Sequence, residues 1–87
     1  MKRKIICYDI HGGDSGSYNE VYSFIEKELS GTRATESVYI CFSDKDNNDI
    51  RDIISKKFGE DVSVLVNDFP LGAAWYNLND ASKWKDL

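Results

Sequence analysis

One stretch near the start of the chain constrains the fold most strongly. Residues 5–10 form an apolar run that is interrupted only by Asp9, and Gly12 and Gly13 follow it closely. An apolar run of this kind is typical of a strand that is buried on both faces, so we expect it at the centre of a sheet. The two glycines allow the backbone to turn sharply after the strand. The run therefore predicts a central strand with one carboxylate near its end.

The rest of the chain alternates between helical and strand-like patterns. Apolar residues recur at helical spacing over residues 18–29 and 50–58, and Gly31 and Gly59 are positioned to end these two helices. Residues that favour an extended chain cover segments 32–36, 37–43 and 62–69. The order strand, helix, strand, strand, helix, strand predicts an α+β domain over residues 1–70 with the ferredoxin-like βαββαβ arrangement.

The expected sheet is antiparallel, with the strand order four-one-three-two and both helices on one face. Because two helices cover only one face, the other face is left open. The alternation of side chains along a strand assigns Tyr39, Cys41 and Leu65 to this open face, together with every second residue of the first strand. A half-apolar open face on an 87-residue chain predicts a homodimer, and we expect Tyr39 and Leu65 in its interface.

Residues 71–87 form a C-terminal extension that differs from the domain before it. Both tryptophans, Trp75 and Trp84, lie in this segment. Large aromatic side chains at a chain end are rarely left wholly in water, so we expect the extension to dock on the domain or on a partner chain. Trp75 and Trp84 are then interface residues. The sequence leaves open whether the extension is a strand or a helix.

Composition limits the class of protein. No stretch approaches the roughly 20 apolar residues of a membrane-spanning helix, and the basic start is too short for a signal peptide, so we expect a cytoplasmic protein. Cys7 and Cys41 are then reduced, and without a second pair of ligands they predict no zinc site. The net charge of −4 argues against a protein that coats nucleic acid generally. Basic clusters at residues 2–4 and 56–57 are typical of solvated surface charge but leave room for a local basic patch.

Three short motifs, in this order, resemble a known family. Residues 8–12 read Tyr-Asp-Ile-His-Gly, residues 36–40 read Glu-Ser-Val-Tyr-Ile, and residues 72–75 read Gly-Ala-Ala-Trp. Together they resemble the CRISPR-associated Cas-two-like superfamily, and within it the small stand-alone SinR-like proteins. The resemblance extends more distantly to virulence-associated protein D, a ribonuclease-like toxin. It implies a ferredoxin-like fold and a homodimer with a link to nucleic-acid processing.

The resemblance also implies a metal site at Asp9. Two Asp9 carboxylates that meet across a two-fold axis could hold one Mg²⁺ or Mn²⁺ for phosphodiester hydrolysis, with His11 as a general acid or base. The other interpretation is structural. Asp9 then accepts backbone hydrogen bonds from the turn at Gly12 and Gly13, and His11 faces solvent.

Two functions remain open at this stage. The first is a non-catalytic homodimeric scaffold that binds a nucleic acid or a protein partner through the extension and a basic cluster, with no small-molecule cofactor. The second is a Mg²⁺- or Mn²⁺-dependent endonuclease that acts on RNA or DNA. The acidic first helix, with Glu20, Glu26 and Glu28 against Lys27, replaces the arginine-rich helix of the CRISPR adaptation subunit. This acidity, together with a single histidine, favours the scaffold over the enzyme.

Overall fold

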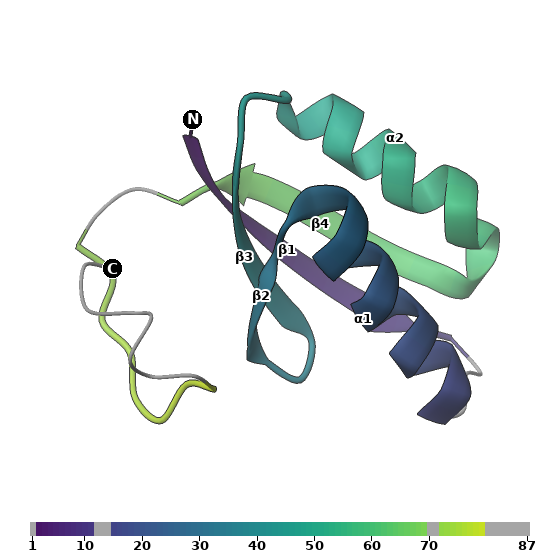
Figure 1. Cartoon of the computed structure of the whole chain (residues 1–87), viewed down its shortest axis with the longest axis horizontal. Coiled ribbons are helices and arrows are strands. Elements are labelled where there is room, and N and C mark those ends of the chain that lie inside the picture. The colour runs from purple at the N-terminus through teal and green to yellow at the C-terminus, as the bar shows by residue number, and fades with distance from the viewer. Residues whose placement is uncertain (1, 12–14, 70–71, 80–87) are drawn as a thin grey trace.

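The computed structural model describes residues 2–11, 15–69 and 72–79. Within them the elements run β1 (Lys2–Ile10), α1 (Ser15–Leu29), β2 (Thr32–Thr35), β3 (Val38–Ser43), α2 (Asn47–Phe58), the short 3-10 helix η1 (Gly59–Asp61) and β4 (Val62–Asp68). The strands form one antiparallel sheet in the order β2-β3-β1-β4 (Figure 1). The predicted α+β class, with an antiparallel sheet and two helices, is confirmed. No helix among the described residues is long and apolar enough to cross a membrane.

β1 lies at the centre of the sheet, between β3 and β4. Its register aligns Ile6 with Tyr39 on one side and with Val66 on the other. Burial alternates along the strand, because Lys4, Ile6 and Tyr8 are buried while their neighbours are partly exposed. The prediction of a central strand is therefore right, but only one of its faces is fully buried.

The two helices cover the same face of the sheet (Figure 1). One continuous core joins the buried side of the strands to the inner stripes of α1 and α2. Its buried members are Ile6, Tyr8, Val21, Ile25, Leu29, Tyr39, Cys41, Ile50 and Ile54. Each helix contributes residues at the spacing of three or four that an amphipathic helix requires. We call the sheet surface on the side away from the helices the open face.

The structure reverses the predicted facing of β3. Tyr39 and Cys41 are 0% and 1% exposed beneath the helices, and Val38, Ile40 and Phe42 lie on the open face. Assigning Tyr39 and Cys41 to the open face was wrong because both sets of β3 side chains are apolar, so alternation alone could not choose between them. The pairing of Tyr39 with Ile6 decides it, since paired residues share a face.

Leu65 of β4 lies on the open face, as the alternation predicted, and is 61% exposed. Its register partner is Cys7 of β1. The other parity of β4, Val62, Val64 and Val66, packs against the core instead. The open face therefore retains exposed apolar surface, although Tyr39 is not part of it.

The connection from α1 to β2 passes so close to the core at Gly31 that a side chain there would not fit. A Cβ atom there would lie 2.9 Å from Ile25 Cγ2 and 3.0 Å from Tyr39 Cδ1. The residue with left-handed geometry is Ser30, whose φ is 53°. The Gly31 N–H donates to the Ile25 carbonyl at 3.3 Å. Gly31 therefore follows α1 as predicted, but it is needed for close approach to the core rather than for a positive φ.

The ends of α2 follow the sequence pattern directly. Asp46 caps the start of the helix, because its Oδ1 accepts the Asp49 N–H at 2.9 Å. Gly59 ends the helix with a φ of 62°, and its N–H donates to the Ser55 carbonyl. These two caps fix the length of α2 and hence where β4 begins.

The described part of the extension, residues 72–79, contacts the open face. Leu78 packs with Ala34 and Ile40, and the Asn79 N–H donates to the Ala34 carbonyl at 2.9 Å. Figure 1 shows this segment on the side of the sheet away from the helices. It contains neither helix nor strand between residues 72 and 79. Trp75 is 40% exposed, and Trp84 lies outside the described residues.

Candidate functional site

Asp9 lies at the end of β1 on the open face, and its side chain is exposed. Its register partner is Ser63, the second residue of β4. An exposed carboxylate keeps its hydration, so Asp9 does not need the compensating charge that a buried carboxylate would need. Gly12 and Gly13, the turn expected to bind it, lie outside the described residues. The exposed Asp9 carboxylate can be reached by a metal ion or by another chain.

His11 lies against the start of β4 beside Asp9. The Nε2 atom of its ring is 2.5 Å from Ser63 Oγ, and its backbone N–H donates to the Asp61 carbonyl at 2.8 Å. The contact with Ser63 orients the imidazole, and His11 is exposed, as the structural interpretation expected. Asp9, His11 and Ser63 meet at one corner of the sheet. Ser63 was not among the predicted site residues, and the only signal for it was its place at the start of the strand that pairs with β1.

A metal site within one chain is not supported by the described residues. In the ranges 2–11, 15–69 and 72–79, no group of three or more His, Cys, Asp or Glu side chains could hold a metal ion. Asp9 and His11 alone give one carboxylate and one imidazole. Mg²⁺ prefers oxygen ligands and commonly binds through one or two carboxylates with several waters. A second copy of the chain would have to supply the second carboxylate.

The predicted basic cluster at the start of the chain is divided by strand alternation. Lys4 faces the helices, is 3% exposed, and its Nζ bonds Asp68 Oδ1 at 2.5 Å. Arg3 points to the open face, where Nε donates to the Phe69 carbonyl at 2.8 Å and the guanidinium lies 4.8 Å from the centre of the Phe69 ring. Lys2 is exposed. Residues 2–4 therefore do not form one continuous basic surface.

The two cysteines do not form a metal-binding pair. Cys7 faces the open side of the sheet and is partly buried, while Cys41 lies in the core beneath the helices. Burial raises the pKa of the Cys41 thiol, so this thiol stays protonated. Both are free cysteines.

A cluster of tyrosines is the main polar feature under the helices. Tyr8, Tyr18, Tyr22 and Tyr39 form a chain of ring contacts, with centroids 6.0 to 6.2 Å apart. The hydroxyls of Tyr8 and Tyr22 donate to the Glu36 carbonyl at 2.8 and 3.1 Å.

The Tyr39 hydroxyl donates to Glu26 Oε1 at 3.0 Å. Burial raises the pKa of Tyr8, and burial together with the neighbouring Glu26 raises that of Tyr39, so both phenols act as neutral donors. The cluster therefore clamps the turn between β2 and β3 onto α1. Sequence reasoning assigned the helical tyrosines only to an apolar stripe and missed this role.

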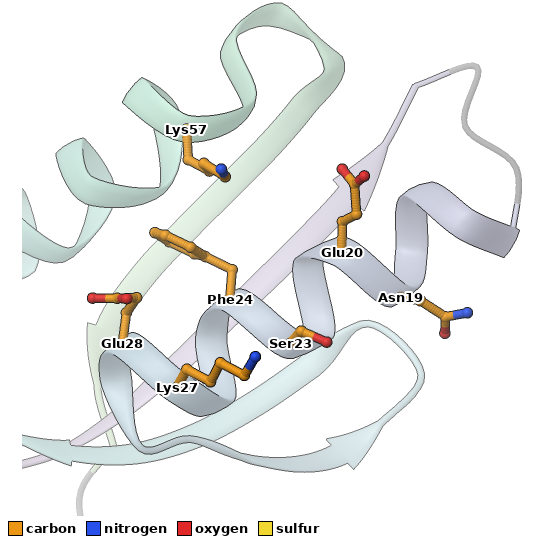
Figure 2. Close-up of a pocket in the computed structure, with 7 residues that line it drawn as sticks. All are labelled: Asn19, Glu20, Ser23, Phe24, Lys27, Glu28 and Lys57. Atoms are coloured by element: carbon orange, nitrogen blue, oxygen red, sulfur yellow. The ribbon is translucent and has the colours of Figure 1, made fainter.

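A shallow hollow between α1 and α2 has a volume of about 490 Å³. Figure 2 shows Phe24, Glu20 and Glu28 on the side of α1 that faces Lys57 of α2. The Phe24 ring packs edge-on against Phe58, with centroids 5.5 Å apart. Charges of both signs surround one partly buried ring, and this lining contains no group set for catalysis.

The structure therefore brings some of the predicted site residues together and separates others. Asp9 and His11 share a corner with Ser63, and Leu65 shares the open face with them. Tyr39 lies in the core, and Trp75 lies on the extension. Compared with known proteins, the chain matches no family model, no curated protein and no solved structure.

Proposed function

We propose that this chain is a small homodimeric protein of the ferredoxin-like fold that acts as a non-catalytic scaffold linked to nucleic-acid processing. The order β2-β3-β1-β4, with both helices on one face, supports the ferredoxin-like assignment. The short motifs at residues 8–12, 36–40 and 72–75 support the link to nucleic-acid processing. The observation that carries the homodimer is the apolar surface left on the open face.

This surface is arranged as rows of residues across the sheet. One row consists of Val38, Cys7 and Leu65, which are register partners on β3, β1 and β4. Phe42, paired with Arg3 in another row, is 58% exposed. Fully burying a side chain of this size contributes about 1.5–3 kcal/mol. A second copy that covers both rows would supply apolar contact area that the described part of the extension, whose Leu78 packs on Ala34 and Ile40, does not.

Sedimentation velocity on the full chain tests the homodimer. The wild type should sediment at about twice the 9.9 kDa chain mass at micromolar concentration, because stable interfaces usually bury more than about 1,000 Å². Leu65→Asp should shift the protein to monomer with unchanged helix content. Ser23→Asp, a charge added at an exposed position of α1, is the matched control and should stay dimeric. A wild type that remains monomeric at about 100 µM would refute the homodimer.

The corner formed by Asp9, His11 and Ser63 favours one second candidate, a metal-dependent endonuclease. A general base near a metal-bound carboxylate is a plausible arrangement for phosphodiester hydrolysis, and His11 is held 2.5 Å from Ser63. In this candidate, two Asp9 carboxylates from two copies would hold one Mg²⁺ or Mn²⁺, and His11 would act as the general acid or base.

Cleavage assays with RNA and DNA separate the two candidates. We expect no robust cleavage by the wild type with or without Mn²⁺, because the described residues of one chain supply too few ligands. Asp9→Asn keeps the size of the side chain but replaces the carboxylate with a poor ligand for a hard cation. Mn²⁺-dependent cleavage by the wild type that is lost in a folded Asp9→Asn variant would establish the nuclease in place of the scaffold.

A further inference from the structure

A second hollow lies at the β2 edge of the sheet, apart from the Asp9 corner. It has a volume of about 440 Å³ and opens between α1, β2 and the extension. Its lining includes Tyr22, Arg33, Thr35, Glu36 and Asn77. Small-molecule sites commonly have volumes of about 300–1,000 Å³, so this hollow is large enough for a ligand of nucleotide size.

Arg33 is the cation of this hollow, and an aromatic ring holds it in place. Its guanidinium carbon lies 4.2 Å from the centre of the Tyr22 ring. That ring is itself fixed, because the Tyr22 hydroxyl donates to the Glu36 carbonyl and the ring contacts Tyr8 and Tyr39. A guanidinium with a fixed orientation loses less conformational freedom when it binds a ligand.

Arg33 has no carboxylate partner in the part of the chain that the structure describes. Asp68 is paired with Lys4 and Asp52 with Arg51, so these two carboxylates are engaged elsewhere. A half-buried guanidinium without an anionic partner is a good binding group for a carboxylate or a phosphate. The hollow therefore favours an anionic ligand even though the whole chain carries a net charge of −4.

The other donors in the lining favour a phosphate over a carboxylate. Thr35 contributes a hydroxyl and Asn77 an amide to the same hollow. Asn77 has a φ of 58°, a left-handed geometry that asparagine adopts more readily than most residues. Three kinds of donor match the three terminal oxygens of a phosphate monoester, whereas a carboxylate offers two.

We propose that this hollow binds the phosphate monoester of a nucleotide, with Arg33 on the phosphate and Thr35 and Asn77 as further donors. Inorganic phosphate alone would leave much of the hollow empty. The nucleoside part of a nucleotide would fill the remaining volume. Bases stack on guanidinium planes as well as on aromatic rings, and Arg33 supplies such a plane where it lies over the Tyr22 ring. The proposal does not rest on the homodimer, because all of these groups come from one chain.

Amide chemical shifts of the full-length ¹⁵N-labelled chain provide the test. Titration with adenosine 5′-monophosphate should give saturable shifts at residues 33–36 and 77–79. Inorganic phosphate should shift the same amides more weakly, and adenosine, which lacks the phosphate, should not shift them. Arg33→Gln should weaken binding of the monophosphate by about tenfold or more, because a charge-assisted bidentate contact is lost.

Matched variants separate a local site from a general charge effect. Arg51→Gln removes the same charge from α2, where Arg51 pairs with Asp52, and should leave the affinity unchanged. Glu36→Gln removes a carboxylate from the lining and should strengthen binding. Arg33→Lys keeps the charge and should retain partial binding. It replaces Arg33→Gln as the test variant if Arg33→Gln proves unstable.

Three outcomes would overturn the proposal. These are the absence of saturable shifts up to about 10 mM monophosphate, equal binding by wild type and folded Arg33→Gln, and an equal loss in Arg51→Gln. A 5′-phosphorylated tetranucleotide that binds more tightly than the monophosphate would identify a strand end as the source of the phosphate, and the reverse would identify a free nucleotide. Sedimentation velocity of Arg33→Gln checks that this variant self-associates like the wild type. A loss of nucleotide binding is then not caused by a loss of the homodimer.

Discussion

Lys4 is a buried lysine on the central strand, and its ion pair with Asp68 offsets part of the cost of burying the ammonium group. The two residues are register partners on β1 and β4, and the lysine Nζ bonds the aspartate Oδ1. Lys4 is 3% exposed, whereas the Asp68 side chain is 54% exposed. The pair therefore costs desolvation mainly at the lysine, and the aspartate stays partly hydrated.

Single substitutions of this pair should have unequal effects on the free energy of unfolding. Asp68→Ala leaves a buried ammonium without its carboxylate and should lower stability clearly. Lys4→Met keeps most of the side-chain volume, removes the buried charge, and should be close to neutral or stabilising. Urea denaturation of both variants measures the difference. Equal losses of stability in the two variants would contradict the idea that the buried charge dominates.

Asp68 should also make stability depend on acid pH. The hydrogen bond from Lys4 lowers the pKa of the Asp68 carboxyl below its ordinary value of 3.8. Because the folded pKa is the lower one, the contribution of the pair is fully present above about pH 4 and is lost as pH falls through the folded value. Thermal unfolding of wild type and Lys4→Met between about pH 2 and 6 should show a steeper acid loss in the wild type. Parallel curves would show that the pair does not contribute in this way.

At the scale of elements, the junction of α1 and β2 is tightly packed at Gly31. Gly31→Ala should lower stability by about 1–3 kcal/mol, because the added methyl overlaps Ile25 and Tyr39 and overpacking costs this much. Ser30→Gly, one residue earlier, relieves a positive φ and should have a neutral or slightly stabilising effect. Chemical denaturation of the two variants checks both signs, and an unaffected Gly31→Ala variant would mean that this junction can relax.

The extension should stabilise the domain through Leu78 rather than through its exposed aromatics. Leu78 packs against Ala34 and Ile40, whereas Tyr76 is 92% exposed. Leu78→Ala should lower the free energy of unfolding by about 1–2 kcal/mol, and Tyr76→Ala should change it by less than about 0.5 kcal/mol. Thermal melts of the two variants give the comparison. The reverse order of effects would place the docking contact elsewhere in residues 71–87.

The elements were predictable from the sequence where local signals agree with the fold, and not where long-range pairing decides. The helical stripe of α1 and the caps of α2 are local patterns, and both appear in the structure. The facing of β3 was not predictable, because both of its parities are apolar and only the register with Ile6 fixes them. Asp9 and His11 were found from their place after the central strand, whereas Ser63 and the Arg33 hollow depend on residues that are far apart in the chain.

At the scale of the whole molecule, the open face carries its charges in an order that suits a two-fold axis. Along β1 the open-face residues run Arg3, Ile5, Cys7 and Asp9. A second copy stacked with its β1 antiparallel to the first, about an axis between Ile5 and Cys7, would bring Arg3 of each copy near Asp9 of the other. Aligned sheets pack with strand directions within about 30°, which keeps these ends close.

Charge reversal tests this arrangement of the homodimer. Asp9→Arg alone and Arg3→Glu alone should each weaken self-association, because each places like charges together. An equimolar mixture of the two variants should associate more strongly than either alone, since the opposite charges then meet. Sedimentation equilibrium measures all three samples. Association of each single variant at wild-type strength would exclude this stacking but leave other dimer geometries open.

The separation of aromatic side chains gives the protein two independent optical reporters. Four of the five tyrosines form the cluster between α1 and the sheet, and both tryptophans belong to residues 71–87. Near-ultraviolet circular dichroism from the coupled phenols will therefore follow the packing of α1, while tryptophan fluorescence will follow the extension alone. An early fluorescence change during gentle heating, before any loss of the phenol signal, will identify release of the extension from a domain that is still folded.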